Sequence, residues 1–405
     1  MGKMTFYLVL GFSLLYMILG NNTNKMSTST IQNMADYNAR TVAQNIAVSG
    51  ANIAANEIFL NNSWTKGINQ FDYLNGKLDV TVKILDKVQN IRKLTSVGTF
   101  GGVSKSVEVT LRPSKFSKFA YYSTSEGKNI WWTGNDTVWG PFHTQDYLRA
   151  YNHPVFYGKA TSKKKLRFYK NKKSDEPKFY GGYERGVNLP LPNNGLIELE
   201  NNANSSGLFF DTKDTIYITF QEDSIRYKFA YNEKETVAYL PSVAPNGAIF
   251  AKHSTIRLKG VVKGQYSVGC SYGVSGGTVF LDDDIVYKTN PLINPSSTDL
   301  LGIVAGNNVL ITDNTANHDD INIHASIYSE KGGFGADNYA NRPVSGNINL
   351  VGGIIQDERQ PVGTFGKSGI VSGFAKRYRY DDRFMLISPP YFPGTGGLEI
   401  VSWFE

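Results

Sequence analysis

The sequence contains a single cysteine, Cys270, among its 405 residues. One cysteine excludes an intrachain disulfide framework, a CxxC redox centre and a zinc site built from thiolates. A lone cysteine usually behaves as a small buried hydrophobe, and we expect Cys270 to do so. Redox chemistry is therefore not expected to be the function of this chain.

Proline is missing from the first 112 residues, and no charged residue lies between Lys3 and Lys25. The apolar run from Met4 to Gly20 would be about 26 Å long as a helix, just under the roughly 30 Å hydrocarbon core of a bilayer. The sequence therefore predicts a transmembrane anchor over residues 1–22. Its lipid-facing residues are expected to be Phe6, Leu8, Leu10, Phe12, Leu14, Leu15 and Ile18.

Two interpretations of this apolar run compete, a cleaved signal peptide and a retained anchor. Residues 19–22, Leu-Gly-Asn-Asn, do not form the small-residue cleavage pattern of a signal peptide. We favour the retained anchor, with a cytoplasmic N-terminus and the bulk of the chain exported. The lysines that flank the run on both sides give only weak support to this orientation.

The stretch after the anchor repeats apolar and small residues every three or four positions, which indicates an amphipathic helix. Without a proline, anchor and stripe can form one helix of roughly 50 to 55 residues, about 80 Å long. The alternative is an ordinary core helix behind a separate anchor. The packing stripe is predicted to contain Val42, Ile46, Gly50, Ile53 and Ala54.

Three segments with alternating apolar residues, at 78–84, 91–97 and 103–111, predict an antiparallel sheet that covers this stripe. We expect residues 23–113 to form one α+β module. The 24 tyrosines, 23 phenylalanines and 40 glycines of the chain favour strands and tight turns, so the fold is expected to be mainly β.

A seven-residue pattern recurs in the C-terminal part, at 256–262, 321–327 and 348–354, with a small residue at its fifth position. Related segments follow at intervals typical of the coils of a parallel β-solenoid, or β-helix. The sequence predicts such a domain over residues 114–405. An insertion rich in β-structure is expected to interrupt it at 163–254, and residues 388–403 are expected to cap the open end of the stack.

The predicted insertion begins with a strongly basic segment. It could bind nucleic acid through phosphate contacts, with Phe168, Tyr169, Phe179, Tyr180 and Tyr183 interleaved. The alternative, which we favour, is a solvated lysine-rich loop or one that rests on anionic lipid. The candidate basic patch contains Lys163, Lys164, Lys165, Arg167, Lys170, Lys172 and Lys173.

The first 113 residues resemble the N-terminal module of PilX-like minor pilins and type IV pilus assembly proteins of Gram-negative bacteria. The segments that carry this resemblance are AQNIAVSGANIAANEIF and the strand run IRKLTSVGTFGGVSKSVEVTLRP. The resemblance implies a pilin-like module that inserts into the inner membrane. The prepilin cleavage pattern of the family is absent, because Gly2 is followed by Lys-Met-Thr-Phe-Tyr.

Residues 131–405 resemble an uncharacterised envelope domain that recurs behind PilX-like anchors. The segments GPFHTQDYLRAYNHPVFYGKAT, STDLLGIVAGNNVLITDN and VGTFGKSGIVSGFAKRYRYDDRF carry this second resemblance. It implies no catalytic residues.

The chain lacks the GxSxG, P-loop and Rossmann motifs, and no pair of its five histidines has the spacing of a helical metal site. We expect no enzyme activity, no cofactor and no metal, and Asp282–Asp284 to lie in a solvated turn or at a strand end. The alternative is a β-helix enzyme that cleaves polysaccharide, with Asp282–Asp284 and Arg342, Arg359 or Arg377 as candidates.

Taken together, these patterns predict a single-pass protein of the bacterial inner membrane with a periplasmic or extracellular C-terminal domain. Its expected role is that of a minor pilin-like component, or of an assembly or scaffold factor, of a type IV pilus or related secretion system, with adhesion as a further possibility. Pilins or other envelope proteins are the expected partners, and no small-molecule substrate is expected. A DNA-binding pilus subunit is a further alternative.

Overall fold

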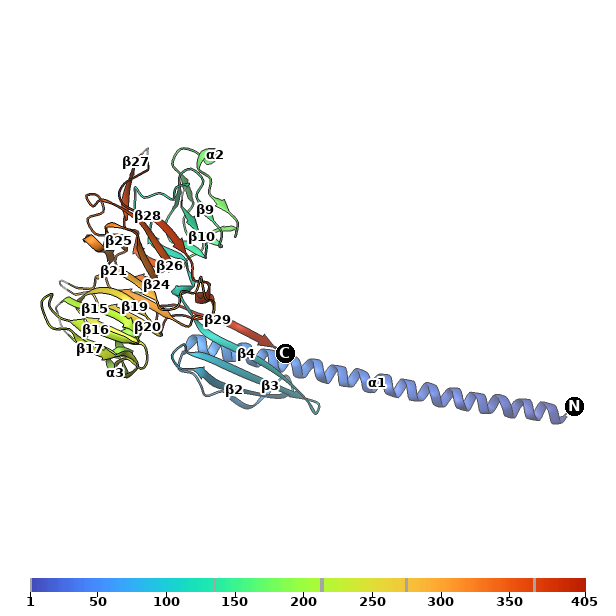
Figure 1. Cartoon of the computed structure of the whole chain (residues 1–405). Helices are drawn as coiled ribbons and strands as arrows, with labels where there is room; N and C mark the ends of the chain where they lie inside the picture. Colours follow the sequence, from blue (N-terminus) through green and yellow to red (C-terminus); the bar gives the residue numbers. More distant parts are fainter. Residues whose placement is uncertain (1, 135, 212–214, 274–275, 367–368) are drawn as a thin grey trace. The chain divides into compact units, whose positions relative to one another are not determined.

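The computed structural model describes residues 2–134, 136–211, 215–273, 276–366 and 369–405 (Figure 1). The chain forms a long N-terminal helix followed by a body rich in β-strands. It divides into two compact units: residues 1–112 with 398–405 form unit 1, and residues 113–397 form unit 2.

Unit 1 consists of one helix and a five-stranded sheet with the strand order β1-β2-β3-β4-β29. Strands β1 to β4 pair antiparallel with their neighbours along the chain. The segments predicted at 78–84, 91–97 and 103–111 lie within β2, β3 and β4. The elements are α1 (Gly2–Leu60), β1 (Ile68–Tyr73), β2 (Gly76–Asp86), β3 (Ile91–Phe100), β4 (Val103–Lys115) and β29 (Gly394–Phe404).

Helix α1 runs without interruption for 59 residues, about 89 Å at 1.5 Å per residue. Its first 37 residues, 2–38, are exposed, whereas small and apolar side chains of the second part are buried. The buried residues are Ala39, Ala43, Ile46, Ala47, Gly50, Ala51, Ala54 and Ile58. Of the predicted stripe, Ile46, Gly50 and Ala54 are buried, Val42 is half-buried, and Ile53 is 37% exposed at the edge of the contact.

Two glycines let the helix approach the sheet closely. A Cβ atom on Gly98 of β3 would lie 2.2 Å from the carbonyl oxygen of Ala43 and 2.6 Å from the amide nitrogen of Ala47. A Cβ atom on Gly50 of α1 would lie 2.3 Å from Leu78 Cδ1. The helix backbone therefore packs directly on β3, and a side chain at position 98 would separate the two.

The last strand of the chain belongs to unit 1, which corrects the expectation that residues 388–403 cap the C-terminal stack. Strand β29 hydrogen-bonds to the edge of the sheet next to β4. Nε and Nη2 of Arg112 both donate to Glu399 Oε2, at 3.1 and 2.9 Å. Leu398 and Trp403 pack against the core of the unit. Unit 2 is therefore inserted between two adjacent strands of one sheet.

We predict that Gly98→Ala lowers the unfolding temperature of the full-length protein in detergent, because the added methyl group meets helix backbone. The expected loss is about 1–3 kcal/mol, the usual range for overpacking. Gly20→Ala is the matched control, because a Cβ atom at Gly20 meets nothing within 4 Å. Equal thermal stability of the two variants would contradict the close helix–sheet contact.

The first part of unit 2 consists of short strands. They are β5 (Tyr121–Ser125), β6 (Thr137–Val138), β7 (Phe142–Thr144), β8 (Leu148–Ala150), β9 (Val155–Phe156), β10 (Ala160–Ser162), β11 (Leu166–Phe168), β12 (Lys178–Phe179) and β13 (Tyr183–Arg185). The first part also holds the 3-10 turn η1 (Phe116–Lys118) and the short helix α2 (Lys172–Asp175).

The remaining strands of unit 2 are longer. They are β14 (Leu208–Asp211), β15 (Thr215–Glu222), β16 (Ser224–Lys228), β17 (Thr236–Tyr239), β18 (Ala248–Lys252), β19 (Thr255–Val262), β20 (Gln265–Cys270), β21 (Val279–Tyr287), β22 (Leu300–Ala305), β23 (Val309–Ile311), β24 (Ile321–Ser329), β25 (Phe334–Ala336), β26 (Val344–Glu358), β27 (Gly363–Gly366) and β28 (Gly369–Arg379). Two helices, α3 (Ile197–Ser206) and α4 (Leu240–Val243), and two 3-10 turns, η2 (Thr315–His318) and η3 (Asp382–Met385), complete the unit.

Most strand pairs of unit 2 are parallel, and two of the three predicted seven-residue patterns, at 321–327 and 348–354, are in register with each other. The pattern at 256–262 is not in register with them, because Gly260 pairs with Ile285 and Ile285 pairs with Ile323. Ile321 pairs with Ile348, Ala325 with Gly352 and Ile327 with Ile354. Gly352 has φ +150°, and a Cβ atom there would lie 1.8 Å from the carbonyl oxygen of Ala325. The small residue of the pattern is therefore required by the close approach of the neighbouring strand.

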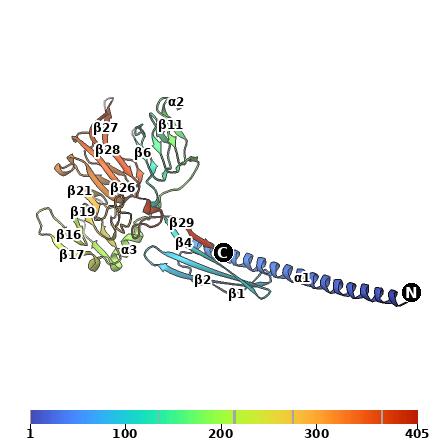
Figure 2. The same ribbon diagram turned by 45° about the vertical axis from the view of Figure 1, so that its right-hand side comes forward.

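The order of the paired strands differs from their order in the sequence, and early strands lie beside late ones, as β6 does beside β28 (Figure 2). One series runs β14-β18-β20-β22-β24-β26 and continues through β5, β7 and β10 to β13. The first strands of the unit are therefore added to β26, near the end of the chain. A second series runs β15-β19-β21-β24-β26-β28.

The segment that we predicted as an insertion, 163–254, contributes strands to these parallel series. Strands β12 and β13 pair with β9 and β10, and β14 pairs with β18. Only β15, β16 and β17 form the antiparallel excursion expected there. Apolar side chains from all these strands share one core, and Cys270 is buried in it as expected, where burial raises the pKa of its thiol to about 12.

Candidate functional site: a polar groove beside stacked aromatic rings

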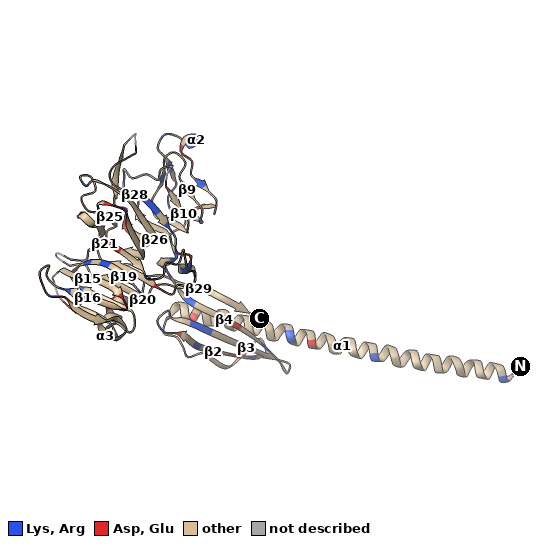
Figure 3. Cartoon of the chain, in the orientation of Figure 1, with Lys and Arg blue, Asp and Glu red and all other residues tan. Residues whose placement is uncertain are grey.

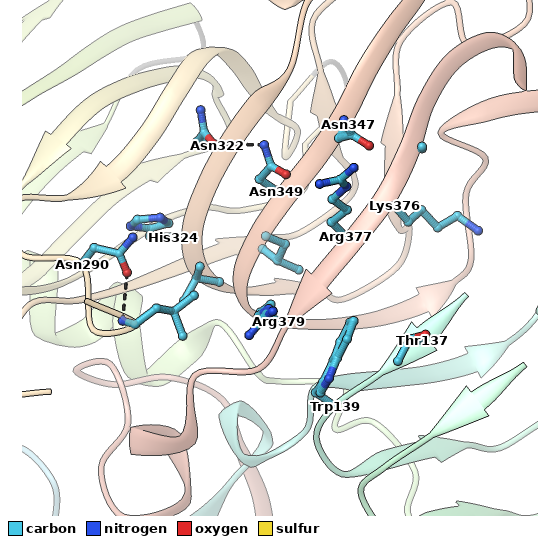
Figure 4. A pocket seen from close by; sticks show the side chains of 14 residues that line it. Thr137, Trp139, Asn290, Asn322, His324, Asn347, Asn349, Lys376, Arg377 and Arg379 are labelled. Carbon is cyan, nitrogen blue, oxygen red and sulfur yellow. Dashed lines mark hydrogen bonds between the residues drawn. The ribbon is translucent and has the colours of Figure 1, made fainter. Parts of the chain in front are cut away.

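A groove of about 670 Å³ lies on unit 2, a volume within the usual range for ligand sites (Figure 4). Its walls come from β6, β24, β26, β28 and the loop after β21. The lining residues are Thr137, Trp139, Asn290, Leu292, Asn322, His324, Asn347, Asn349, Leu350, Val351, Ala375, Lys376, Arg377 and Arg379. Three of them are cationic at neutral pH, and none is an aspartate or glutamate.

Parallel register places the polar residues of the groove in a row. Asn322 of β24 pairs with Asn349 of β26, which pairs with Arg377 of β28. Nδ2 of Asn349 donates to Oδ1 of Asn322 at 3.2 Å, a bond drawn in Figure 4. Neighbouring parallel strands are about 4.8 Å apart, so the row is continuous across three strands.

Two carboxylates outside the groove orient these amides. Asp284 accepts hydrogen bonds from the backbone and side-chain nitrogens of Asn322, at 2.7 and 2.9 Å. Asp320 accepts from the backbone and Nδ2 of Asn347, at 2.7 and 3.0 Å, and from Nδ2 of Asn349 at 3.4 Å. Burial raises the pKa of Asp320, but these hydrogen bonds and the charge of Arg377 outweigh it and lower the pKa below its usual value.

The donor groups of Asn347 and Asn349 are thus directed toward Asp320, and this fixes where their carbonyl oxygens lie. Within the described parts of the chain, neither of these two oxygens has a hydrogen-bond partner. The groove therefore offers two oriented hydrogen-bond acceptors beside a guanidinium group.

A second row lies two residues further along the same strands and therefore on the same face. It consists of His324, Val351 and Arg379, which are in register. The side chain of Lys376 points away from those of Arg377 and Arg379, as Figure 4 shows. Its amine lies 3.7 Å from a carboxylate oxygen of Asp136. Only Arg377 and Arg379 therefore present exposed charge to the groove.

The two groove arginines differ from most arginines of unit 2. Arg149, Arg226, Arg257, Arg359 and Arg383 form ion pairs with carboxylates. Among the described residues, Arg377 and Arg379 form neither an ion pair nor a hydrogen bond. Two exposed guanidinium groups on one face are thus open to a ligand.

Stacked aromatic rings extend from one side of the groove. Trp139 stacks on Tyr157 with a centroid distance of 6.2 Å, and Tyr157 stacks on Tyr180 at 5.0 Å. The Arg379 guanidinium lies 5.3 Å from the centroid of Trp139 and connects this series to the groove. The three rings are 42%, 48% and 66% exposed, respectively.

These rings occupy equivalent positions of three paired parallel strands. Val138, Phe156 and Phe179 pair in register through β6, β9 and β12, and the aromatic residue follows each of them. A glycine comes next after each ring, at 140, 158 and 181. The third copy of this pattern lies in the segment that we predicted as an insertion.

His324 is buried at the base of the groove and is uncharged at neutral pH. Its Nδ1 accepts a hydrogen bond of 3.1 Å from the backbone nitrogen of Tyr287, so the ring hydrogen is on Nε2. Burial lowers the pKa of His324 to about 4, against the opposing charges of Asp381 and Asp284. Burial likewise lowers the pKa of His143, on β7, to about 4.

All seven residues of the predicted basic patch are exposed, but several already contact other side chains. Figure 3 marks on the ribbon where the Lys and Arg residues lie along the chain. Lys164 pairs with Asp146 at 2.9 Å, and Arg167 lies 3.6 Å from the ring centroid of Tyr147. Lys170 lies 5.9 Å from the ring centroid of Tyr151, and Lys172 pairs with Glu176. No ion pair or ring contact is found for Lys163, Lys165 and Lys173 among the described residues.

The candidates for a polysaccharide-cleaving site are not brought together as a catalytic group. Asp282–Asp284 lie within β21, which corrects the expected turn or strand end, at a register shift opposite β19. Asp282 forms a two-point ion pair with Arg257. Arg342 is buried and donates to carbonyl oxygens, including that of Asn317 at 2.7 Å. Of the three arginine candidates, only Arg377 lines the groove.

The third candidate, Arg359, belongs to a buried ion pair. Its Nη1 donates to Oε2 of Glu126 at 2.8 Å, and both side chains are at most 5% exposed. Trp132 Nε1 donates to the same oxygen at 2.9 Å, while Tyr121 and Ser123 donate to Oε1. Every oxygen of this buried carboxylate is therefore satisfied, and the pair joins the segment after β5 to the end of β26.

We predict that Glu126→Ala destabilises unit 2 by about 3–5 kcal/mol, because it leaves the Arg359 guanidinium buried without its counterion. Urea unfolding of the full-length protein in detergent measures the effect. Glu184→Ala is the control, since the Lys159–Glu184 pair is exposed and such pairs contribute less than about 1 kcal/mol. Similar urea midpoints for the two variants would be inconsistent with this role of Glu126.

The two buried histidines predict a loss of stability in mild acid. Their pKa values are about 4 in the folded protein and about 6.5 in the unfolded chain, so the unfolded chain takes up protons first as pH falls. The free energy of unfolding should fall from pH 6.5 to 4, by at most roughly 3 kcal/mol for each histidine. His143→Asn with His324→Asn should flatten this pH dependence; an unchanged slope would show that other groups cause it.

Comparison with known proteins gives little further information. No family model matches the chain, and no curated protein matches it. Among solved structures, the competence-associated pilin ComZ from Thermus thermophilus is similar, with a TM-score of 0.34 and 11% sequence identity. The match covers 90% of this chain and 97% of that one. At this level the likeness carries no inference about function.

Within the described residues, no group of three or more His, Cys, Asp or Glu side chains is placed to hold a metal ion. The groove itself was not predicted from the sequence. Its residues come from segments that are far apart along the chain, and only the parallel order of β24, β26, β28 and β6 brings them together. Asn322 in β24 and the alternating Asn347 and Asn349 in β26 were a signal, but they gave no information on Arg379 or Trp139.

Proposed function

We propose that this protein is a single-pass component of the bacterial inner membrane that belongs to a type IV pilus or related secretion system. In this role it acts as a minor pilin-like subunit or as an assembly or scaffold factor. Unit 2 lies in the periplasm or outside the cell and binds without catalysing a reaction. Pilins or other envelope proteins are the proposed partners.

The observation that carries the proposal is that the two halves of α1 differ: the first is apolar and exposed, and the second packs on the sheet. Its most apolar 18-residue window has a mean hydropathy of 1.6 and is entirely unburied, and by length and composition it can cross a membrane. The C-terminal part of the same helix packs on an antiparallel sheet through small residues. A helix that is both membrane anchor and core element connects the sheet to the membrane through residues 21–38, which extend about 27 Å at 1.5 Å per residue.

The exposed middle of α1 supports an assembly role. Between the apolar run and the packed part, Ile31, Met34 and Tyr37 are 66%, 74% and 73% exposed. Large apolar side chains in water are stabilised when a neighbouring subunit covers them. The resemblance of residues 1–113 to PilX-like minor pilins agrees with helix-to-helix packing of this kind.

The composition of the groove supports the proposal that the protein is not an enzyme. Glycoside hydrolysis generally requires two carboxyl groups on either side of the scissile bond. None of the residues that line the groove is an Asp or Glu. The nearby Asp284 and Asp320 are occupied with asparagine side chains.

We predict that Leu10→Lys with Leu14→Lys moves the protein out of the inner-membrane fraction, because two charges at the centre of the helix each cost several kcal/mol on insertion. Cell fractionation with detection of the full-length chain measures this. Met34→Lys, an exposed site outside the apolar run, is the control and should remain in the membrane. Membrane association of the double variant would overturn the proposed anchor.

Site-specific crosslinking separates the pilus assignment from anchoring alone. Because Cys270 is fully buried, a cysteine introduced at Met34 is the accessible thiol of the chain. We expect Met34→Cys to crosslink to a pilin in cells that assemble type IV pili. Ser205→Cys, exposed on α3, is the control site. Membrane localisation without any crosslink from Met34 to a pilus protein would refute the pilus role and leave the anchor intact.

A further inference from the structure

We propose that the groove and the adjoining rings of unit 2 form a binding site for an acidic oligosaccharide, a chain of sugars that carry carboxylate groups. The surface lies wholly within unit 2. The proposal therefore goes beyond the membrane role and does not depend on α1.

The charge of the groove indicates an anionic ligand. Arg377 and Arg379 are exposed on one face, unpaired among the described residues, and no carboxylate lines the groove. They are two residues apart on β28, so their Cα atoms are roughly 6.6 Å apart. Guanidinium groups bind carboxylates with two parallel hydrogen bonds, which favours charged groups at intervals along a ligand.

The oriented asparagines require a ligand that also donates hydrogen bonds. Oδ1 of Asn347 and Oδ1 of Asn349 are acceptors, since the amide nitrogens of both residues are bound to Asp320. His324 adds a donor at the base of the groove, because its hydrogen is on Nε2. A sugar hydroxyl can donate to the first two and accept from the third, whereas a phosphodiester group has no hydrogen to donate.

The aromatic rings favour a sugar chain over single-stranded nucleic acid. Bases bind such proteins by stacking on free ring faces. Here the facing surfaces of Trp139, Tyr157 and Tyr180 are occupied by one another, and Arg379 lies against Trp139. What remains open is the exposed edge of the series, where the hydroxyl groups of Tyr157 and Tyr180 can donate hydrogen bonds to and accept them from sugar hydroxyls along an extended chain.

The test measures binding of defined oligosaccharides to the full-length protein in detergent by isothermal titration calorimetry. The probes are tetrasaccharides of galacturonate, mannuronate, sialic acid and hyaluronan. The matched neutral probe for each is the same tetrasaccharide with all of its carboxylates methyl-esterified. We expect at least one acidic probe to bind and the affinity of its neutral form to be at least roughly tenfold lower.

Variants locate the site. Arg377→Ala with Arg379→Ala should weaken binding of that probe at least roughly tenfold, and Trp139→Ala should also weaken it. Arg226→Ala, an exposed arginine paired with Glu235 on another part of unit 2, should leave the affinity unchanged. An unfolding temperature and a far-ultraviolet circular dichroism spectrum unchanged in the double alanine variant show that its loss of binding is not misfolding.

Three results would overturn the proposal. The first is no binding of any acidic tetrasaccharide. The second is binding that the arginine and tryptophan variants leave unchanged. The third is binding of a single-stranded 15-nucleotide DNA, abolished by the double arginine variant, without binding of the saccharides.

Discussion

The parallel register of the strands in unit 2 is the constraint on which the rest of the unit depends. When neighbouring parallel strands are hydrogen-bonded in register, side chains of one kind at paired positions form continuous rows, with about 4.8 Å between strands. Inward-facing rows such as Ile321 with Ile348 form the core. Outward-facing rows give the asparagine–arginine series and the three stacked rings. A slip of one residue would exchange the two faces and remove core and groove together.

Rows of polar side chains lower the stability of the fold unless their hydrogen bonds are satisfied. In this molecule some of the polar groups are satisfied and others are left open. Asp284 and Asp320 satisfy the amide donors of the groove, while the carbonyl oxygens and the two arginines remain open. In the interior the opposite holds: the carboxylate of Glu126 accepts from Arg359, Trp132, Tyr121 and Ser123. The buried Glu126 carboxylate is thus fully paired, as a buried charge requires, whereas the unpaired groups of the groove lie where a ligand can reach them.

Local patterns in the sequence predicted local structure well. The uncharged run before Lys25, the absence of proline and the small-residue stripe together indicated the continuous helix, and alternating residues located β2, β3 and β4. The repeated pattern at 321–327 and 348–354 located two strands that pair in register. Each of these predictions rests on residues that are close together in the sequence, where side-chain periodicity is sufficient evidence.

The features that the sequence did not reveal depend on contacts between distant segments. Nothing near Tyr121 indicates that β5 pairs with β26, and nothing near Trp139 indicates its contact with Arg379. Ile53 fits the helical periodicity, but the sheet does not extend far enough to cover it. The apolar pattern of β29 was visible, yet its partner β4 lies almost 300 residues earlier, as the Arg112–Glu399 pair shows.

Because β29 returns to the sheet beside β4, unit 2 is joined to the anchored unit by two covalent connections that leave from neighbouring strands. A mechanical pull on anything held by unit 2 is therefore shared between two strands of the same sheet, and detachment of one of them leaves the other as a tether. The same arrangement makes unit 2 an exchangeable insertion. A short turn in its place would still join β4 to β29, and a different domain could be inserted at the same point of unit 1.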